Sequence, residues 1–185
     1  MSAHTFGLYT GERVTGQAAA VAYTWPDMDL HFGPEDRKFL YRVAGVAIRG
    51  GKVLIHSWEG QTAFFCLPGG RVSMGEPAAA AIAREMREEL ACEVRVGRLL
   101  WLIENLFTHN GIAHHEIGLY FEITLPEGVP QASGEAWTGH EEDGSEMYFR
   151  WQPLDRLGEI DLKPSCLKSL LMALPEHTEY VLHGD

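Results

Sequence analysis

Three glutamates, Glu85, Glu88 and Glu89, lie in a segment whose composition predicts a helix over residues 77–91. Proline is tolerated in a first helical turn, and the alanine run that follows has the highest helix propensity. At about 100° per residue, Glu89 falls about 20° and Glu85 about 60° from Ile82, which marks the apolar face. The carboxylates therefore form a stripe beside the side of the helix that faces the core.

A stripe of carboxylates in this position suits a metal site. A buried carboxylate without a partner is costly, and acidic residues at i, i+3 and i+4 repel one another. A hard divalent cation resolves both problems, and Mg²⁺ prefers carboxylate and water oxygens. The alternative is a solvated amphipathic helix with surface ion pairs such as Arg84–Glu88. Wheel geometry alone leaves both interpretations open.

The elements that must position this helix are mostly strands. β-branched and aromatic runs predict strands at residues 41–48, 52–58, 93–105, 115–124 and 147–152. We expect the first two to form a hairpin across the turn at residues 49–52. Residues 126–144, rich in Gly, Pro and acidic side chains, predict a long loop, and residues 164–174 predict a second helix. Strands around one strong helix indicate an α+β fold with a mixed sheet packed by helices.

Composition limits the partners of this chain. Its 185 residues are 45% apolar, enough for a core, and its formal net charge is −11. This charge argues against polymeric nucleic acid and anionic membranes as partners, and an anionic substrate would need cations at its site. Cys66, Cys92 and Cys166 form no CxxC pair, so we expect reduced thiols. Without a signal-peptide pattern, the expected location is the cytoplasm.

The stretch from Gly70 to Cys92 resembles the Nudix box, a motif of one glycine followed by spaced glutamates and an arginine. The matching glycine and charged positions are Gly70, Glu76, Arg84, Glu85, Glu88 and Glu89. Ala91 stands where the family has a helix-ending glycine, so we expect the helix to end differently here. Residues 67–76 and 149–157 extend the similarity, which covers residues 41–174.

The resemblance implies a Nudix-type α/β/α sandwich with a central mixed β-sheet. It divides the chain into a Nudix hydrolase domain at residues 39–185 and an extension at residues 1–38, an arm or edge strand. Many relatives form homodimers, and the extension could supply that contact.

The implied activity is Mg²⁺-dependent hydrolysis, with Mn²⁺ as a substitute, of a phosphoanhydride bond. The substrate would be a small nucleotide, a nucleoside diphosphate linked to another group. Signatures of three known substrate groups are missing, so nucleoside triphosphates and sugar nucleotides stay open. The alternative is an inactive Nudix-fold ligand sensor or binding module. Loss of the metal-binding glutamates usually marks that class, and all three are present.

The resemblance also implies roles for individual residues. The metal ligands would be the Gly70 carbonyl and the carboxylates of Glu85, Glu88 and Glu89. Arg84 would hold a glutamate, Glu76, by a charge-assisted bond.

Other site residues are less constrained by the motif. For the general base, Glu88 or Glu89 is the first choice and Glu146 the second. Arg42 would bind phosphate, and Glu116 would face the substrate. Three aromatic residues could stack on a base, although core packing is expected for the first two: Trp101, Phe107 and Trp137.

Overall fold

Two β-sheets make up the framework of the computed structural model, which describes residues 28–58, 64–127, 137–140 and 146–185. The larger sheet is mixed, and its strands follow the order β1 (His31–Phe32), β2 (Arg37–Val46), β6 (Ile112–Thr124), β5 (Arg95–His109) and β9 (Glu179–Gly184). The smaller sheet is antiparallel, in the order β3 (Ile48–Arg49), β4 (Lys52–Trp58), β8 (Glu146–Pro153) and β7 (Trp137–His140).

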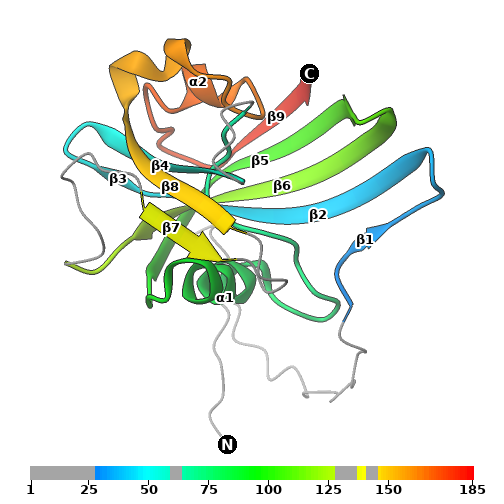
Figure 1. Ribbon diagram of the computed structural model, residues 1–185, viewed down its shortest axis with the longest axis horizontal. Coiled ribbons are helices and arrows are strands. Elements are labelled where there is room, and N and C mark those ends of the chain that lie inside the picture. Colours follow the sequence, from blue (N-terminus) through cyan, green and yellow to red (C-terminus); the bar gives the residue numbers. More distant parts are fainter. Residues whose placement is uncertain (1–27, 59–63, 128–136, 141–145) are drawn as a thin grey trace, which may run out of the picture.

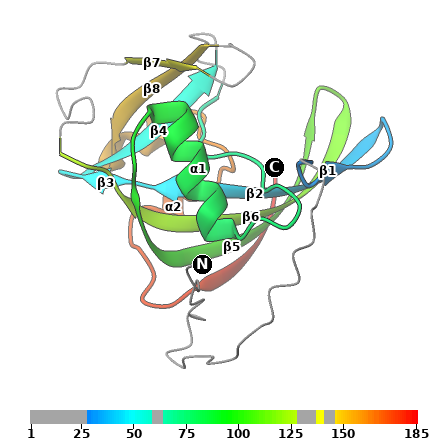
Figure 2. The same cartoon turned by 90° about the horizontal axis from the view of Figure 1, so that it is seen from below.

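Helices cover the strands on opposite sides (Figures 1 and 2). The long helix α1 (Ala78–Leu90) packs on one side, and η1 (Leu154–Glu159) and α2 (Leu167–Leu170) pack on the other. Because side chains alternate along a strand, β2 sends Val43 into the α1 core and Ala44 into the α2 core. The predicted α+β sandwich with a mixed sheet is confirmed.

The predicted hairpin of residues 41–48 and 52–58 is wrong. β4 begins and ends where predicted, but only the short strand β3 pairs with it across the turn. β2 instead runs parallel to β6 in the larger sheet. The chain passes from the larger to the smaller sheet at Ala47. The predicted strand at residues 41–48 is therefore divided between β2 and β3. This pairing places β2 between β1 and β6, with α1 packed on one of its faces and α2 on the other.

Three other segments also differ from the sequence prediction. The loop predicted at residues 126–144 contains β7, and β9 was not predicted at all. The helix predicted at residues 164–174 is reduced to the single turn of α2. Residues next to α2 form hydrogen bonds between positions three apart rather than four, such as the Leu167 amide to the Pro164 carbonyl at 3.1 Å. β1 is an edge strand; residues 1–27 lie outside the described residues.

The hairpin between β5 and β6 has a tight two-residue turn. Asn110 and Gly111 have φ of 51° and 78°. Both central residues of a type I′ turn need positive φ, and Asn-Gly is the preferred pair. This turn sets the β5–β6 register, which places Asn105 opposite Glu116 and Phe107 opposite His114.

Two further features concern the cysteines and the lengths of the helices. Cys66, Cys92 and Cys166 are all free, as expected. No helix within the described ranges has the length and apolar character needed to cross a membrane.

Helix α1 ends at Ala91, which has φ of 50° and ψ of 35°, the left-handed conformation. The helix thus ends as a glycine would end it, contrary to the expectation of a different ending. A residue with a Cβ is strained in this conformation.

We expect Ala91→Gly to raise the free energy of unfolding by about 1 kcal/mol, because glycine adopts positive φ without steric cost. Urea denaturation of both proteins measures this difference. Lower stability of the variant would contradict a strained helix end.

A second prediction concerns His56, which is fully buried between Trp58 and Phe149, with ring centroids 4.7 and 5.5 Å away. Burial lowers the pKa of His56 to about 3, and the nearby Arg42 charge adds to the effect. The unfolded chain, with a histidine pKa near 6.5, binds the proton more readily, so stability falls as pH drops below about 6.5.

Between pH 7 and pH 5 this single group should remove about 2 kcal/mol of unfolding free energy. Denaturation at the two pH values should show that His56→Leu loses correspondingly less stability than the wild type. An equal loss in both proteins would refute a neutral buried histidine.

Candidate active site

The loop from Leu67 to Glu76 leads into helix α1 and crosses the edge of β2. The amide of Val43 donates to the carbonyl of Gly70 at 2.9 Å, and the amide of Gly45 donates to that of Pro68 at 2.8 Å. Gly69 has φ of 141°, and a Cβ there would lie 2.2 Å from the Val43 carbonyl oxygen. The loop therefore lies directly against β2, and this close approach requires glycine.

Gly70 is pressed against the first glutamate of the helix. A Cβ at Gly70 would lie 2.3 Å from Oε2 and 2.4 Å from Oε1 of Glu85. Glu85 is 9% exposed. Burial raises the pKa of Glu85 to about 7, although the Arg84 guanidinium works against the rise. The missing side chain of Gly70 thus makes the space that this carboxylate occupies.

The other two motif glutamates differ in their surroundings. Glu89 is 6% exposed, on the side of α1 that faces the core, as the helical wheel indicated. The side chain of Glu88 retains 31% of its exposure. Three carboxylates therefore run from a buried to a half-buried position along one side of the helix.

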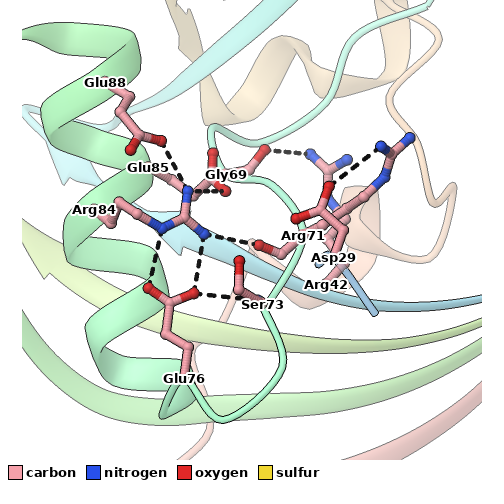
Figure 3. Close-up of polar contacts among 9 residues, drawn as sticks. All are labelled: Asp29, Arg42, Gly69, Arg71, Ser73, Glu76, Arg84, Glu85 and Glu88. Carbon is pink, nitrogen blue, oxygen red and sulfur yellow. Dashed lines mark hydrogen bonds and ion pairs between the residues drawn. The ribbon is translucent and has the colours of Figure 1, made fainter. Parts of the chain in front are cut away.

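Arg84 organises the acidic groups around it (Figure 3). Its Nε and Nη2 each donate to Glu76 at 3.0 Å, one to each carboxylate oxygen. Burial alone would raise the pKa of Glu76, but these bonds hold it below its usual value. Nη2 also donates to the Arg71 carbonyl at 3.0 Å, which fixes the loop to the helix. The predicted Arg84–Glu76 contact is confirmed.

The same guanidinium also contacts two candidate metal ligands. Its Nη1 donates to Glu85 at 3.0 Å and to Glu88 at 2.8 Å. The Arg84–Glu88 pair, which the sequence offered as an alternative to metal binding, is therefore present beside the Glu76 contact. One arginine therefore hydrogen-bonds to three carboxylates, and its single positive charge offsets only part of their negative charge.

These residues fit a hard divalent cation in their chemistry. All the candidate donors are oxygens, which Mg²⁺ and Mn²⁺ prefer. Across the described ranges, no group of three or more His, Cys, Asp or Glu side chains is already gathered in a position to hold an ion. Binding would thus require Glu85 and Glu88 to leave Nη1 of Arg84, while Glu76 keeps Arg84 in place.

Arg42 lies on the opposite side of β2 from α1 and contacts the same loop. Its Nη2 donates to the Gly69 carbonyl at 3.0 Å and to the Leu67 carbonyl at 3.4 Å. Burial would lower its pKa, but nearby acidic groups, Glu116 among them, raise the pKa above its usual value. Arg42 therefore stays a cation held next to the motif loop.

A cavity of about 480 Å³ opens beside Arg42. Glu116, on the neighbouring strand β6, is 7% exposed and lines the same cavity. Burial raises the pKa of Glu116, while the charge of Arg42 and a hydrogen bond from Asn105 oppose the rise. The structure thus brings the two predicted substrate residues into one cavity that reaches the motif loop at Leu67 and Arg71.

Glu146 is exposed at the end of the β7–β8 hairpin, where it pairs with His140 and accepts a hydrogen bond from Tyr148 at 2.6 Å. The adjacent pair contains Gly139, whose added Cβ would lie 2.6 Å from the carbonyl oxygen of Glu89. This hairpin therefore lies against the last turn of α1. The rest of the acidic run, residues 141–145, lies outside the described residues.

The aromatic predictions divide three ways. Trp101 is fully buried in the core, as expected. Phe107 was expected in the core, but it lines the cavity and stacks on His114 instead. The side chain of Trp137 lies outside what the structure describes.

Sequence reasoning missed several residues of the cavity. Asn105, His114, Lys163 and Asp185 line it, and Arg71 joins it to the loop. The signal that would have found Asn105 and His114 is the Asn110-Gly111 turn, because a two-residue turn sets their partners across the hairpin.

Comparison with known proteins identifies the domain to which the chain belongs. A model of the NUDIX domain matches residues 39–173. No curated protein sequence matches the chain at a significant level.

Solved structures share the fold at low sequence identity. The MutT protein from Bacillus halodurans is 16% identical with a TM-score of 0.56, over 78% of this chain and 89% of that one. An ADP-ribose pyrophosphatase from Streptococcus suis is 15% identical with a TM-score of 0.50, over 79% and 98%. A UDP-X diphosphatase is 20% identical with a TM-score of 0.52, over 72% of this chain but only 59% of that protein's length. By its domain match and its fold, the chain belongs to the NUDIX domain family and is a Nudix-type hydrolase.

Proposed function

We propose that this Nudix-type hydrolase is a Mg²⁺-dependent pyrophosphohydrolase that cleaves a phosphoanhydride bond in a nucleoside diphosphate linked to another group. The observation that carries the proposal is the contact of the Glu85 carboxylate with Gly70, beside two further glutamates of α1. Mn²⁺ would substitute for Mg²⁺. Two structures with the same fold are named as a UDP-X diphosphatase and an ADP-ribose pyrophosphatase, and these names support such a substrate.

Within this proposal, Glu85, Glu88, Glu89 and the Gly70 carbonyl hold the metal. A divalent ion bound there would neutralise phosphate oxygens and activate water. Gly70 leaves room for the Glu85 carboxylate, and its carbonyl, which accepts the Val43 amide, has a second lone pair for the metal. Arg84, fixed by two bonds to Glu76, stays beside the glutamates and limits the repulsion among them.

Proton transfer and substrate binding are assigned to nearby groups. Glu88 or Glu89 is the first choice for the base that takes the proton of the attacking water. Glu146 is the second, because its hairpin lies against the end of α1. Arg42 would attract the diphosphate to the mouth of the cavity, where Glu116 faces the rest of the substrate. The cytoplasmic location, the homodimer and the extension at residues 1–38 stay predictions from the sequence.

A screen of nucleoside triphosphates, nucleotide sugars and related diphosphates with Mg²⁺, read out as released phosphate or pyrophosphate, tests this function. We expect turnover that stops when EDTA removes the metal. A well-folded protein that binds nucleotides but cleaves none of them would be a ligand sensor instead.

Glu85→Gln and Glu89→Gln should each lower kcat by about 10²-fold or more, because each removes a charge that holds the metal. The matched control is Glu93→Gln, which alters an exposed carboxylate paired with Arg87 just past the helix. Circular dichroism should show all three variants folded. Wild-type rates in both site variants would refute the assigned ligands.

Gly70→Ala should leave the fold intact, because the three atoms nearest the added Cβ all belong to the end of the Glu85 side chain and none to the backbone. Displacing that carboxylate by about 1 Å should cost about 10²-fold in kcat/KM. Gly158→Ala is the control, since a Cβ there meets no atom of the described residues within 4 Å. Equal activity of the two variants would mean that the Gly70–Glu85 contact has no catalytic role.

A further inference from the structure

The floor of the cavity is built from rows of side chains on one face of the larger sheet. On β2, Arg42 lies beside Gly118 of β6. Farther along β6, Glu116 pairs with Asn105 of β5, and His114 pairs with Phe107. Successive rows on one face are two residues apart, about 7 Å. The cavity therefore presents a cation, then a polar pair, then a pair of rings, in a line leading away from the motif loop.

The middle row, Asn105 and Glu116, contains a buried acceptor to which no group donates within the described part of the chain. Asn105 is 4% exposed, and its amide donates to the Glu116 carboxylate. That leaves Oδ1 of Asn105 buried and without a hydrogen-bond partner among the described residues. A buried acceptor left in this state is costly and is usually explained by a ligand or water. Asn105 and Glu116 together offer two adjacent acceptors to whatever fills the cavity.

The third row offers a flat apolar surface. The rings of Phe107 and His114 are stacked, with centroids 4.7 Å apart and planes 9° from parallel. Phe64 and Trp58 line the same cavity, and their ring centroids are 5.9 Å apart. Aromatic walls of this kind bind planar heterocycles by stacking.

We propose that the cavity binds a ribonucleoside diphosphate moiety, with its ribose diol donating to Asn105 and Glu116. The base would pack against Phe107 and His114, and the diphosphate would point to Arg42 and the motif loop. The sugar lies between phosphate and base in a nucleotide, as the polar row lies between Arg42 and the rings. Vicinal hydroxyls supply the two donors that this row lacks. The enzyme therefore discriminates ribose from 2′-deoxyribose substrates.

This inference rests on the proposed function only for the nucleoside diphosphate as ligand. What is new is the sugar, ribose, and the two residues that bind its hydroxyls, Asn105 and Glu116. An amino group of a base could also donate to the polar row, but it would make no distinction between the two sugars. The sugar comparison therefore tests the assignment directly.

The experiment is calorimetric titration of the full chain, in EDTA so that no turnover occurs. The probes are ADP, GDP, CDP and UDP with their 2′-deoxy counterparts. We expect the tightest ribonucleotide to bind about tenfold better than its deoxy form, because the deoxy form leaves a buried acceptor without a hydrogen bond. Equal affinities for the two sugars, or no binding of any probe, would overturn the proposal.

Variants assign the effect to the polar row. Asn105→Leu removes the buried acceptor, and the ribose preference should fall to nearly one. Glu104→Gln is the matched control, since Glu104 precedes Asn105 on β5 but bonds His115 and Tyr180 instead; it should keep the preference. If Asn105→Leu does not fold, Asn105→Ala removes the same acceptor and gives the same comparison. A full preference in the folded site variant would also overturn the proposal.

Parallel turnover assays with Mg²⁺ separate this inference from the proposed function. A ribose preference in binding without cleavage of any substrate would remove the hydrolase proposal alone. Cleavage of ribo and deoxy substrates with equal kcat/KM would remove the sugar assignment alone.

Discussion

The site depends on the close approach of a glycine backbone to a buried carboxylate. Gly70 has no side chain, so the Glu85 carboxylate fills the place where a Cβ would be. This contact needs the loop to lie flat on β2, which the adjacent Gly69 permits at φ of 141°. It also needs α1 to present its acidic side to the loop, and Arg84 secures this by bonding both Glu76 and the Arg71 carbonyl. Loop, strand and helix therefore hold one another in position.

β2 connects the acidic helix to the cavity on its other side. Val43 packs under α1, while Arg42, the residue before it, points to the cavity and holds two carbonyls of the loop. The negative net charge of the chain would repel an anionic substrate, and a fixed cation at this point would offset that repulsion. Glutamates on one side of the loop and an arginine on the other suit a substrate whose phosphates meet both.

Local signals in the sequence predicted helix α1 well. The proline, the alanine run and the glutamate spacing indicated α1 within one residue at each end, and the helical wheel placed Glu89 on the buried side. The cavity was harder to predict because its residues come from strands that are distant in sequence. Asn105 meets Glu116, and Phe107 meets His114, only through the β5–β6 register, and β2 joins β6 rather than the adjacent β4. The local Asn110-Gly111 turn signals the β5–β6 register, whereas the pairing of β2 with β6 depends on packing of the whole chain.

The most direct measurement is anomalous diffraction from a crystal soaked with Mn²⁺. Our interpretation predicts a peak beside Gly70 that contacts Glu85, Glu88 and Glu89, with Glu88 turned away from Arg84 and Glu76 still bound to it. The contrary result is a map without a peak at this place, in which Arg84 keeps both Glu85 and Glu88. In that case the acidic stripe would be a structural ion-pair network, and the chemistry would lie elsewhere.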